Sequence, residues 1–333
     1  MKRIIQRAYH LWLRIVLESC RFPKRLYRFG WKVAINSFWD GLIPPGKSKR
    51  YISTIESYVD RFLEPLIYQY NNRNLSNEQT YHQLDEQIIP IWCCWWQGIE
   101  QMPEIVRLCH ERLKQVIPKD KAELHVITID NYQEYVELPD YIVEKFQKKI
   151  ITMTTMSDIL RFNLLEKYGG YWIDATVFYT GNIPMDYFTK DFYCQRMHSD
   201  KEKVKREACR GNWCGFSMAG SKHNLVFRYM KDAFNEWWKY YDDIVDYVLI
   251  DYLLWTAYRK IPDIRHIIDS VEDNNEDIFE LYQVLNQEYT DILIEQLTKR
   301  NVMHKLTYKM DLFKKTDLGK RTLYGYLLET YMR

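Results

Sequence analysis

Residues 157 to 176 read SDILRFNLLEKYGGYWIDAT, and this stretch decides the fold. Its first part, up to Tyr168, has the spacing of a helix with one apolar and one polar side, and Ser157 is its expected N-cap. Gly169 is the expected stop of this helix. The apolar run that follows, Tyr171–Tyr179, predicts a buried strand. A helix, a glycine corner and a strand that carries Asp174 therefore follow one another.

The region before this stretch predicts a parallel sheet. Ile88–Trp96 is a nearly uninterrupted apolar run without charges, and Leu124–Ile129 is a second β-rich run. Between them, Pro103 opens a helix that continues to Ile117. Strand, helix and strand in this order imply parallel strands. Because open α/β sheets bind ligands at the carboxyl ends of their strands, Asp174 is expected at a ligand-binding edge.

Three charged side chains in the same stretch form the candidate site. Asp158 and Arg161 are three positions apart and share one helix face. A carboxylate such as Asp174 at the sheet edge is suited to hold a hard divalent cation beside phosphate oxygens. The structural alternative is an ion pair on a helix surface and an acid that ends a strand. The occurrence of all three at this spacing favours the site.

Composition excludes several classes of protein. The 333 residues are 47% hydrophobic and 28% charged, which excludes a disordered, collagen-like or low-complexity chain. The seven cysteines lack zinc-binding spacing, which fits a reducing cytosol. The sequence has no GxSxG, Walker or GxGxxG motif, so a serine hydrolase, a P-loop NTPase and a Rossmann dehydrogenase lack their necessary parts.

The first 50 residues differ from the rest in charge. They hold 12 Lys or Arg and two acids, a net of +10 against +2 for the whole chain, so the remainder carries −8. Met1–Trp39 has the pattern of a basic amphipathic helix broken near Pro23, which favours attachment to an anionic membrane surface through residues 1–40. The alternative is an arm that packs on protein. The apolar run is too short for a transmembrane span, no signal-peptide cleavage site follows, and nucleic-acid binding is disfavoured.

We divide the chain into this segment, residues 1–50, and a domain of residues 51–333. Helices are expected over Tyr51–Tyr70, Asp140–Lys149, His223–Tyr240 and Asp243–Lys260, and a strand over Phe216–Ala219. Leu42–Arg50 reads as a linker, and Asn71–Glu78 and Lys201–Arg210 as solvated loops.

The motifs resemble a known family of enzymes. The stretch SDxLR…YGGxxxD is preceded by Ile88–Trp92, Trp95–Gly98, Met102–Val106 and Leu138–Ile142. This order resembles the signature of sugar-nucleotide-dependent glycosyltransferases of family 32 and of the clostridial glucosylating toxins, and most closely that of the bacterial capsular polysaccharide synthesis proteins. The resemblance covers about Ile88 to Thr180, with a weaker trail to Lys309.

The resemblance implies a fold and a donor. The fold is α/β of the GT-A type, a Rossmann-like mostly parallel sheet flanked by helices, here with an N-terminal basic helical extension and additional C-terminal helices. A nucleotide-sugar, usually a UDP-sugar, would lie across the end of the sheet. By motif position, Trp92 or Trp96 resembles the tryptophan that stacks on uracil, and Asp130 and Asn131 sit where the second strand would contact the nucleoside.

The resemblance also implies roles for the charged residues. Asp158 and Arg161 match residues that hold the sugar hydroxyls and the diphosphate side. Asp174 matches the first acid of the DxD metal motif, and Thr176 replaces the second, so Mn²⁺ or Mg²⁺ is expected with one charged ligand fewer. Independently of the family, glycosyl transfer needs a cation at the departing diphosphate and acceptors near the sugar.

Four further residues are candidates with open alternatives. Asn212, in a Gly-Asn-Trp-Cys-Gly segment, is either part of a sugar platform or a turn residue. Asp251 resembles an acid that faces the sugar, or it is a solvated or capping acid. Lys305 and Lys309 resemble the closing segment whose basic side chains approach the diphosphate, or they form a surface cluster.

The sequence therefore predicts a glycosyltransferase that moves a hexose from a nucleotide-sugar to a glycan or lipid-linked glycan acceptor in capsular or surface polysaccharide synthesis. The resemblance points to retention of anomeric configuration. The expected location is cytoplasmic, peripheral on the inner face of the cell membrane. The main alternative is a non-catalytic carbohydrate- or membrane-associated scaffold with a degenerate site, which Thr176 supports. A glycoside hydrolase ranks lower, because the spacing gives no second acid near Asp174.

Overall fold

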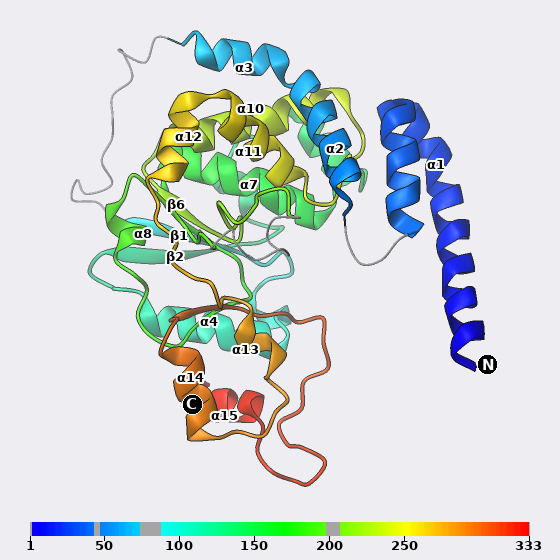
Figure 1. The fold of residues 1–333 in the computed structure, drawn as a ribbon. Coiled ribbons are helices and arrows are strands. Elements are labelled where there is room, and N and C mark those ends of the chain that lie inside the picture. The colour runs from blue at the N-terminus through cyan, green and yellow to red at the C-terminus, as the bar shows by residue number, and fades with distance from the viewer. Residues whose placement is uncertain (1, 43–46, 74–87, 198–206, 333) are drawn as a thin grey trace.

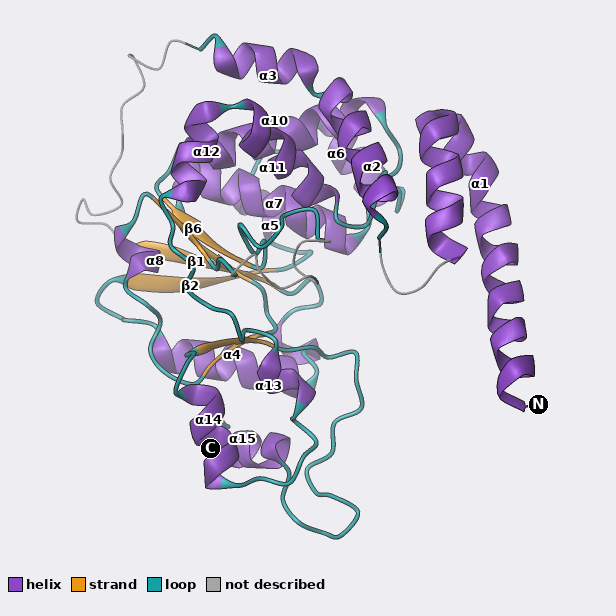
Figure 2. Cartoon of the chain, in the orientation of Figure 1, coloured by secondary structure: helices purple, strands orange, loops and turns teal. Residues whose placement is uncertain are grey.

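A five-stranded sheet runs through the middle of the molecule, with helices on both of its faces (Figures 1 and 2). The structure is a computed structural model and describes residues 2–42, 47–73, 88–197 and 207–332. The strands follow the order β2 (Ala122–Ile127), β1 (Ile89–Cys94), β3 (Gly170–Ile173), β6 (Ser217–Gly220) and β5 (Phe192–Cys194). The first three are parallel, and β6 and β5 pair antiparallel with their neighbours. The expected α/β architecture is confirmed, with two antiparallel strands added at one edge.

The strands alternate between two buried faces, as the charge-free runs require. Trp92 and Trp172 are paired neighbours and point into the core on one face. Ile91 and Tyr171, one position earlier in each strand, point into the core on the other face. Both faces are therefore covered, and only the strand ends are left to form a site.

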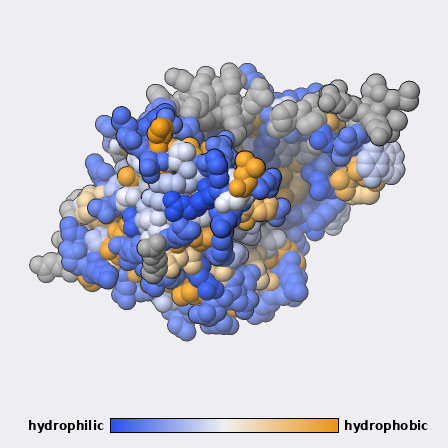
Figure 3. All heavy atoms as spheres, turned by 90° about the horizontal axis from the view of Figure 1, so that it is seen from below, coloured by the Kyte–Doolittle hydropathy of each residue, from blue (hydrophilic) through white to orange (hydrophobic). Residues whose placement is uncertain are grey.

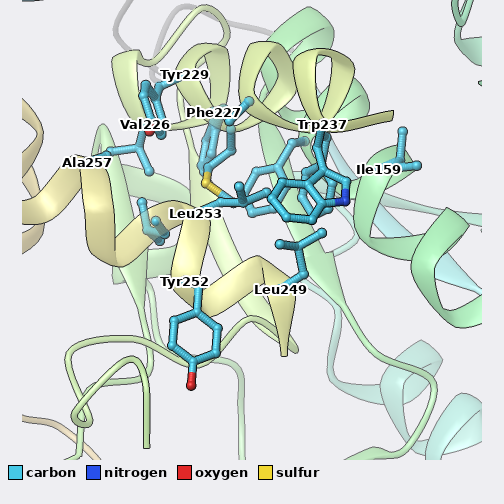
Figure 4. Packing of buried hydrophobic residues seen from close by; sticks show 14 of the residues in the cluster. Ile159, Val226, Phe227, Tyr229, Trp237, Leu249, Tyr252, Leu253 and Ala257 are labelled. Atoms are coloured by element: carbon cyan, nitrogen blue, oxygen red, sulfur yellow. The ribbon is translucent and has the colours of Figure 1, made fainter. Parts of the chain in front are cut away.

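One core lies between the sheet and a group of helices that Figure 1 shows above it. Figure 4 shows Phe227 and Trp237 of α10 packed with Leu249 and Leu253 of α11. The helices of this side are α2 (Lys49–Phe62), α3 (Glu64–Asn71), α5 (Tyr132–Tyr135), α6 (Asp140–Gln147), α7 (Met153–Tyr168), α10 (Leu225–Tyr240), α11 (Leu249–Lys260) and α12 (Pro262–Asp269).

The second core lies on the opposite face of the sheet. It includes a two-stranded antiparallel sheet, β4 (Val177–Tyr179) with β7 (Met303–Lys305), which pairs Val177 with Lys305. The remaining elements are α4 (Glu104–Val116), α8 (Asp186–Thr189), α13 (Glu280–Gln283), α14 (Asp291–Thr298), α15 (Leu323–Tyr331) and the 3₁₀ turn Ile99–Gln101. The β4–β7 pairing carries the C-terminal part of the chain to the edge of the main sheet.

Helix α1 (Lys2–Leu42) is folded back on itself at Gly30, where φ is 80° and ψ is 174°. Its two legs lie side by side at the margin of Figure 1, and Phe22 of the first leg contacts Phe38 of the second. The break expected near Pro23 is therefore wrong: Pro23 lies within the helix, and glycine makes the turn. Within the described ranges, no helix has both the length and the hydropathy needed to span a membrane.

Three further expectations about the deciding stretch can be compared with the structure. Helix α7 begins one turn earlier than expected, and the Thr152 hydroxyl caps it by accepting from the Thr155 N–H, so Ser157 is not the N-cap. The stop at Gly169 is confirmed, with φ of 67°. The single strand expected over Tyr171–Tyr179 is two strands in different sheets, because the chain turns at Asp174.

The corner between α7 and β3 requires glycine at position 170. Gly170 has φ of 93°, a region that side chains rarely adopt. A Cβ there would lie 2.1 Å from the Pro90 carbonyl oxygen on β1. Because residue 170 has no side chain, β3 can begin close to β1. This close approach fixes the position of β3, and with it the position of Asp174 at its end, relative to β1.

Candidate active site

A cavity of about 550 Å³ opens at the carboxyl ends of β1 and β3. It lies within the size range of small-molecule sites. Five segments far apart in sequence form its walls: the end of β1, the first half of α7, β3 with the turn after it, Tyr247 before α11, and the end of β7 with the chain after it. The lining residues are Cys94, Trp95, Trp96, Gln97, Met153, Thr154, Ser157, Asp158, Arg161, Trp172, Asp174, Ala175, Thr176, Tyr247, Lys305, Leu306, Thr307, Tyr308 and Lys309.

Arg161 holds two carboxylates together at the base of this cavity. Its Nη1 lies 3.1 Å from Asp158 Oδ1 and its Nη2 lies 3.3 Å from Asp174 Oδ1. The Arg161 side chain is only 5% exposed and lies over the ring of Trp172. A Cβ at Gly215 would come within 3.0 Å of Nη1, so this glycine leaves room for the guanidinium. The three residues that the sequence singled out therefore share one hollow.

Lys305 contacts both residues that were predicted to hold a metal. Its ammonium nitrogen lies 2.7 Å from Asp174 Oδ2 and 2.8 Å from Thr176 Oγ1. Pairing of β4 with β7 fixes the backbone at Lys305, and the next residue, Leu306, donates its N–H to the Thr176 carbonyl oxygen. Two cations thus face the carboxylates, one from α7 and one from β7.

The three half-buried acids around the site differ in their pKa values. Burial raises the pKa of Asp158 to about 6, against the opposing effect of Arg161. Burial acts on Asp174 in the same direction, but Lys305 and Arg161 outweigh it and lower its pKa to about 2. Burial raises the pKa of Asp251 to about 7, with a smaller contribution from the charge of Asp158. At neutral pH, Asp174 is therefore the fixed anion.

The structure separates the two tryptophans that the sequence could not tell apart. Trp96 lines the cavity, and its indole N–H donates to Ser157 Oγ at 2.8 Å. Trp92 is 2% exposed, and its indole N–H donates to the Gly169 carbonyl oxygen. Both rings belong to the same core, and Trp96 is itself only 6% exposed, so the base-stacking role stays a prediction for which Trp96 is the tryptophan at the cavity.

Asp130 and Asn131 lie next to the cavity without lining it. The Asn131 side chain accepts from the Thr128 N–H and donates to the Val126 carbonyl, so it holds its own turn. The neighbouring Ile129 N–H donates to the Trp96 carbonyl at 3.0 Å. The two segments assigned to the nucleoside thus meet, but the contacts expected from these two side chains stay a prediction.

Asn212 and Asp251 also lie outside the lining. Asn212 accepts from Arg196 and donates to the Cys209 carbonyl, which is the turn role left open by the sequence. The Asp251 carboxylate accepts from the Trp213 indole N–H at 2.9 Å. Lys309, in contrast, does line the cavity.

The residues present do not form a ready divalent-metal site. Asp174 and Thr176 supply one carboxylate and one hydroxyl, and the Lys305 ammonium contacts both. Among the residues that the structure describes, no group of three or more His, Cys, Asp or Glu could hold a metal ion. Hard divalent cations require about six oxygen ligands. The expected Mn²⁺ or Mg²⁺ therefore stays a prediction that this donor set disfavours.

Comparison with known proteins supplies the family. The model of the capsular polysaccharide synthesis protein family matches residues 44–327, which is more than half of the chain. The chain belongs to this family. No curated protein matches it. Among solved structures, it is similar to one titled PaToxG Glycosyltransferase, at 12% identity and a TM-score of 0.36, over 75% of this chain and 95% of that chain.

Several lining residues of this family member were not found from the sequence. Tyr247 precedes α11 and Tyr308 follows β7, and no local motif marks either as a cavity residue. Trp172 alternates with core residues along β3, yet its indole N–H donates to Asp174 Oδ1 at 3.1 Å. Only the fold brings these aromatic side chains to the cavity.

A second hollow, of about 840 Å³, lies over α4 and β2. Its charged lining residues include Glu111 and Lys114, which are exposed and pair with each other. None of the described residues that line it is a buried charged group. We therefore place the site at the smaller cavity, where an arginine and a lysine are held in place.

Proposed function

We propose that this protein is a glycosyltransferase that takes a sugar from a nucleoside-diphosphate sugar, with a UDP-sugar as the first candidate, and transfers it to a glycan or lipid-linked glycan acceptor in capsular or surface polysaccharide synthesis. The observation that carries the proposal is the pair of fixed cations, Arg161 and Lys305, beside Asp158 and Asp174 at the carboxyl edge of the sheet. Membership of the capsular polysaccharide synthesis family supports the setting.

The chemistry of transfer matches this set of charges. The bond between the anomeric carbon and the phosphate oxygen breaks, and its electron pair leaves with the diphosphate. Guanidinium and ammonium groups stabilise that developing negative charge. The acceptor hydroxyl oxygen forms the new bond and loses its proton, and the departing phosphate can take it up. Retention of anomeric configuration, implied by the resemblance, is part of the proposal.

Individual residues receive roles in this proposal. Arg161 and Lys305 bind the diphosphate, and Lys309 approaches it from the chain after β7. Asp158 accepts hydrogen bonds from donor sugar hydroxyls, and Trp96, which lines the cavity, stacks on the base. Asp174 holds the two cations in place.

A panel of nucleotide-sugars tests the proposal. We expect the purified chain to bind at least one common UDP-, GDP- or CDP-sugar, to raise its melting temperature with that donor, and to release the nucleoside diphosphate. A ligand at about one hundred times its Kd stabilises by about 2.7 kcal/mol. The Asp174→Asn variant should keep the fold, as checked by circular dichroism, but should no longer release the nucleoside diphosphate.

The outcomes separate the proposal from its alternative. If the chain binds a donor but neither releases the nucleoside diphosphate nor transfers the sugar to any acceptor in a cell extract, it is the non-catalytic scaffold. Neither binding nor release across the panel would contradict the proposal itself. With the donor known, the anomeric configuration of the product, read by NMR, decides between retention and inversion.

We also propose that α1 attaches the enzyme to an anionic membrane surface on the cytoplasmic side. At about 3.6 residues per turn, Leu11, Ile15 and Leu26 lie on one side of the first leg, with Trp12 beside them. These four side chains are between 39% and 58% exposed. The cations on the other side face the body, where Lys24 and Arg28 pair with Asp243.

Among the described residues, these apolar side chains are exposed, and they lie in a segment whose net charge is +10. In Figure 3 hydrophobic and hydrophilic side chains lie together at the end of the molecule that α1 occupies. Apolar contact combined with attraction to anionic lipid is the mode of an interfacial helix. A second copy of the chain is the other possible occupant of this surface, and the test below distinguishes the two.

Substitution of Trp12 by Glu should weaken binding to vesicles of phosphatidylcholine mixed with phosphatidylglycerol by about tenfold to a hundredfold. This is the change in affinity expected when one aromatic side chain is no longer buried in the lipid. Co-sedimentation measures this. The matched control is Leu318→Glu, which changes an 85% exposed apolar residue far from α1 and should leave vesicle binding unchanged. A wild-type chain that does not bind vesicles, or a Trp12→Glu variant that only loses a dimer in light scattering, would contradict membrane attachment.

A further inference from the structure

Lys305 is held in place at the position where the sequence led us to expect a metal ion. Its ammonium nitrogen contacts Asp174 Oδ2 and Thr176 Oγ1, the two predicted ligand atoms, at 2.7 and 2.8 Å. It also lies 4.9 Å from the centre of the Phe216 ring, a favourable cation–π distance. The Lys305 side chain is 19% exposed, so its charge is largely shielded from water.

The other oxygen of Asp174 is engaged as well. Asp174 Oδ1 accepts from Trp172 Nε1 and lies 3.3 Å from Arg161 Nη2. A divalent ion at Asp174 would therefore have to displace Lys305 and to find its other ligands in water and phosphate alone. Asp158, the other carboxylate among the described residues that line the cavity, is paired with Arg161.

The backbone supports Lys305 as firmly as it supports the acids. The β4–β7 pairing places Lys305 opposite Val177, and the Lys305 N–H donates to the Ile278 carbonyl at 2.8 Å. An ammonium group has three N–H donors. In the part of the chain that the structure describes, two have protein acceptors, and the third remains for an oxygen in the cavity.

We propose that the Lys305 ammonium is the resident cation of this site, and that it binds the donor diphosphate together with Arg161 and without a divalent metal ion. The inference rests on the proposed function, because it concerns the same donor. Two fixed single charges replace one double charge, and both are held in place before the donor arrives. Lys305 is then a donor-binding residue, and Thr176 is a hydroxyl that orients a lysine.

The test compares nucleotide binding with and without metal. Calorimetry with UDP, and with GDP and CDP as alternatives, is run on the full chain in EDTA and then in Mn²⁺. We expect the wild type to bind in EDTA, with a Kd that Mn²⁺ changes by less than about threefold. Lys305→Met should weaken binding by about tenfold to a hundredfold, the value of a charge-assisted hydrogen bond. Lys305→Arg should recover part of the loss.

Lys314→Met is the matched control. It removes the same charge from an exposed lysine that pairs with Glu104, and it should leave nucleotide binding unchanged. Circular dichroism of each variant shows whether it folds. If Lys305→Met does not fold, Lys305→Arg together with the EDTA comparison on the wild type still decides the question.

Three results would overturn the inference. Binding of UDP by the wild type only in Mn²⁺ would refute the inference and leave the proposed function standing. Uptake of one equivalent of Mn²⁺ by the wild type without nucleotide, measured by the loss of the free-ion electron paramagnetic resonance signal, would also refute it. Absence of nucleoside diphosphate binding in both conditions would refute the proposed function and the inference with it.

Discussion

Replacement of Arg161 by Met is expected to lower the free energy of unfolding by about 3–5 kcal/mol at pH 7, the cost of leaving a buried charge without its partner. The guanidinium is 5% exposed and contacts both Asp158 and Asp174. After the substitution Asp174 is still paired with Lys305, whereas Asp158 has lost its ion-pair partner. We therefore expect most of the destabilisation to come from Asp158. Denaturant titration at pH 7 measures the change.

The same substitution should reduce donor turnover by at least about a hundredfold, as for the loss of one donor to a developing anion. The reduction should appear mainly in kcat, because Lys305 continues to bind the diphosphate. Arg161→Lys keeps the charge but cannot form two separate contacts with the same geometry. Its stability and turnover should therefore lie between those of the wild type and those of Arg161→Met.

A second substitution separates electrostatics from packing. In the Asp158→Asn background, Arg161→Met should cost less stability than it costs in the wild type, because no buried carboxylate is left without a partner. Equal costs in both backgrounds would show that Arg161 acts by filling space over Trp172. If Arg161→Met has the stability and turnover of the wild type, Arg161 has no role in the site.

Asp251→Asn is expected to stabilise the protein at alkaline pH by roughly 2–4 kcal/mol and to have little effect near pH 4. Burial raises the pKa of Asp251 to about 7 in the folded chain, from an ordinary value near 4 in the unfolded chain. Between these values the folded state binds more protons, so stability falls as the pH rises through this window.

The asparagine variant cannot ionise and still accepts from the Trp213 indole N–H through its amide oxygen. Its stability should exceed that of the wild type increasingly from about pH 4 to about pH 7 and by a constant amount above. Because the charges of Asp158 and Asp251 interact, the difference also contains the effect of the substitution on the titration of Asp158. Thermal or denaturant unfolding at several pH values measures it. Parallel stability curves would show that the pKa of Asp251 is the same in the folded and the unfolded protein.

The sequence predicted the site where local pattern decides structure. Helix, Gly169 stop and strand were readable because glycine, hydrophobic period and helix spacing act over a few residues. Asp158, Arg161 and Asp174 follow from that segment, and they do share a cavity.

The misassigned features depend on contacts between distant segments. Trp92 and Trp96 have equal local signals, and only the fold shows that both rings are buried and that Trp96 is the one that lines the cavity. The division of Tyr171–Tyr179 into two strands depends on β7, more than a hundred residues later in the chain. No spacing in the sequence indicates that Lys305 would reach Asp174.

The two glycines at positions 98 and 170 show how differently the same residue type can be constrained. Both have positive φ, but a side chain at Gly98 would meet no atom within 4 Å, whereas one at Gly170 would collide with Pro90. Open space does not make a side chain acceptable at Gly98, however, because its φ of 83° and ψ of 166° lie in a backbone region that essentially only glycine adopts. Naturally diverged or randomised versions of this chain should therefore retain glycine at both positions, at 98 because of the backbone conformation alone and at 170 also because a side chain would collide with Pro90 for as long as β1 and β3 remain neighbours.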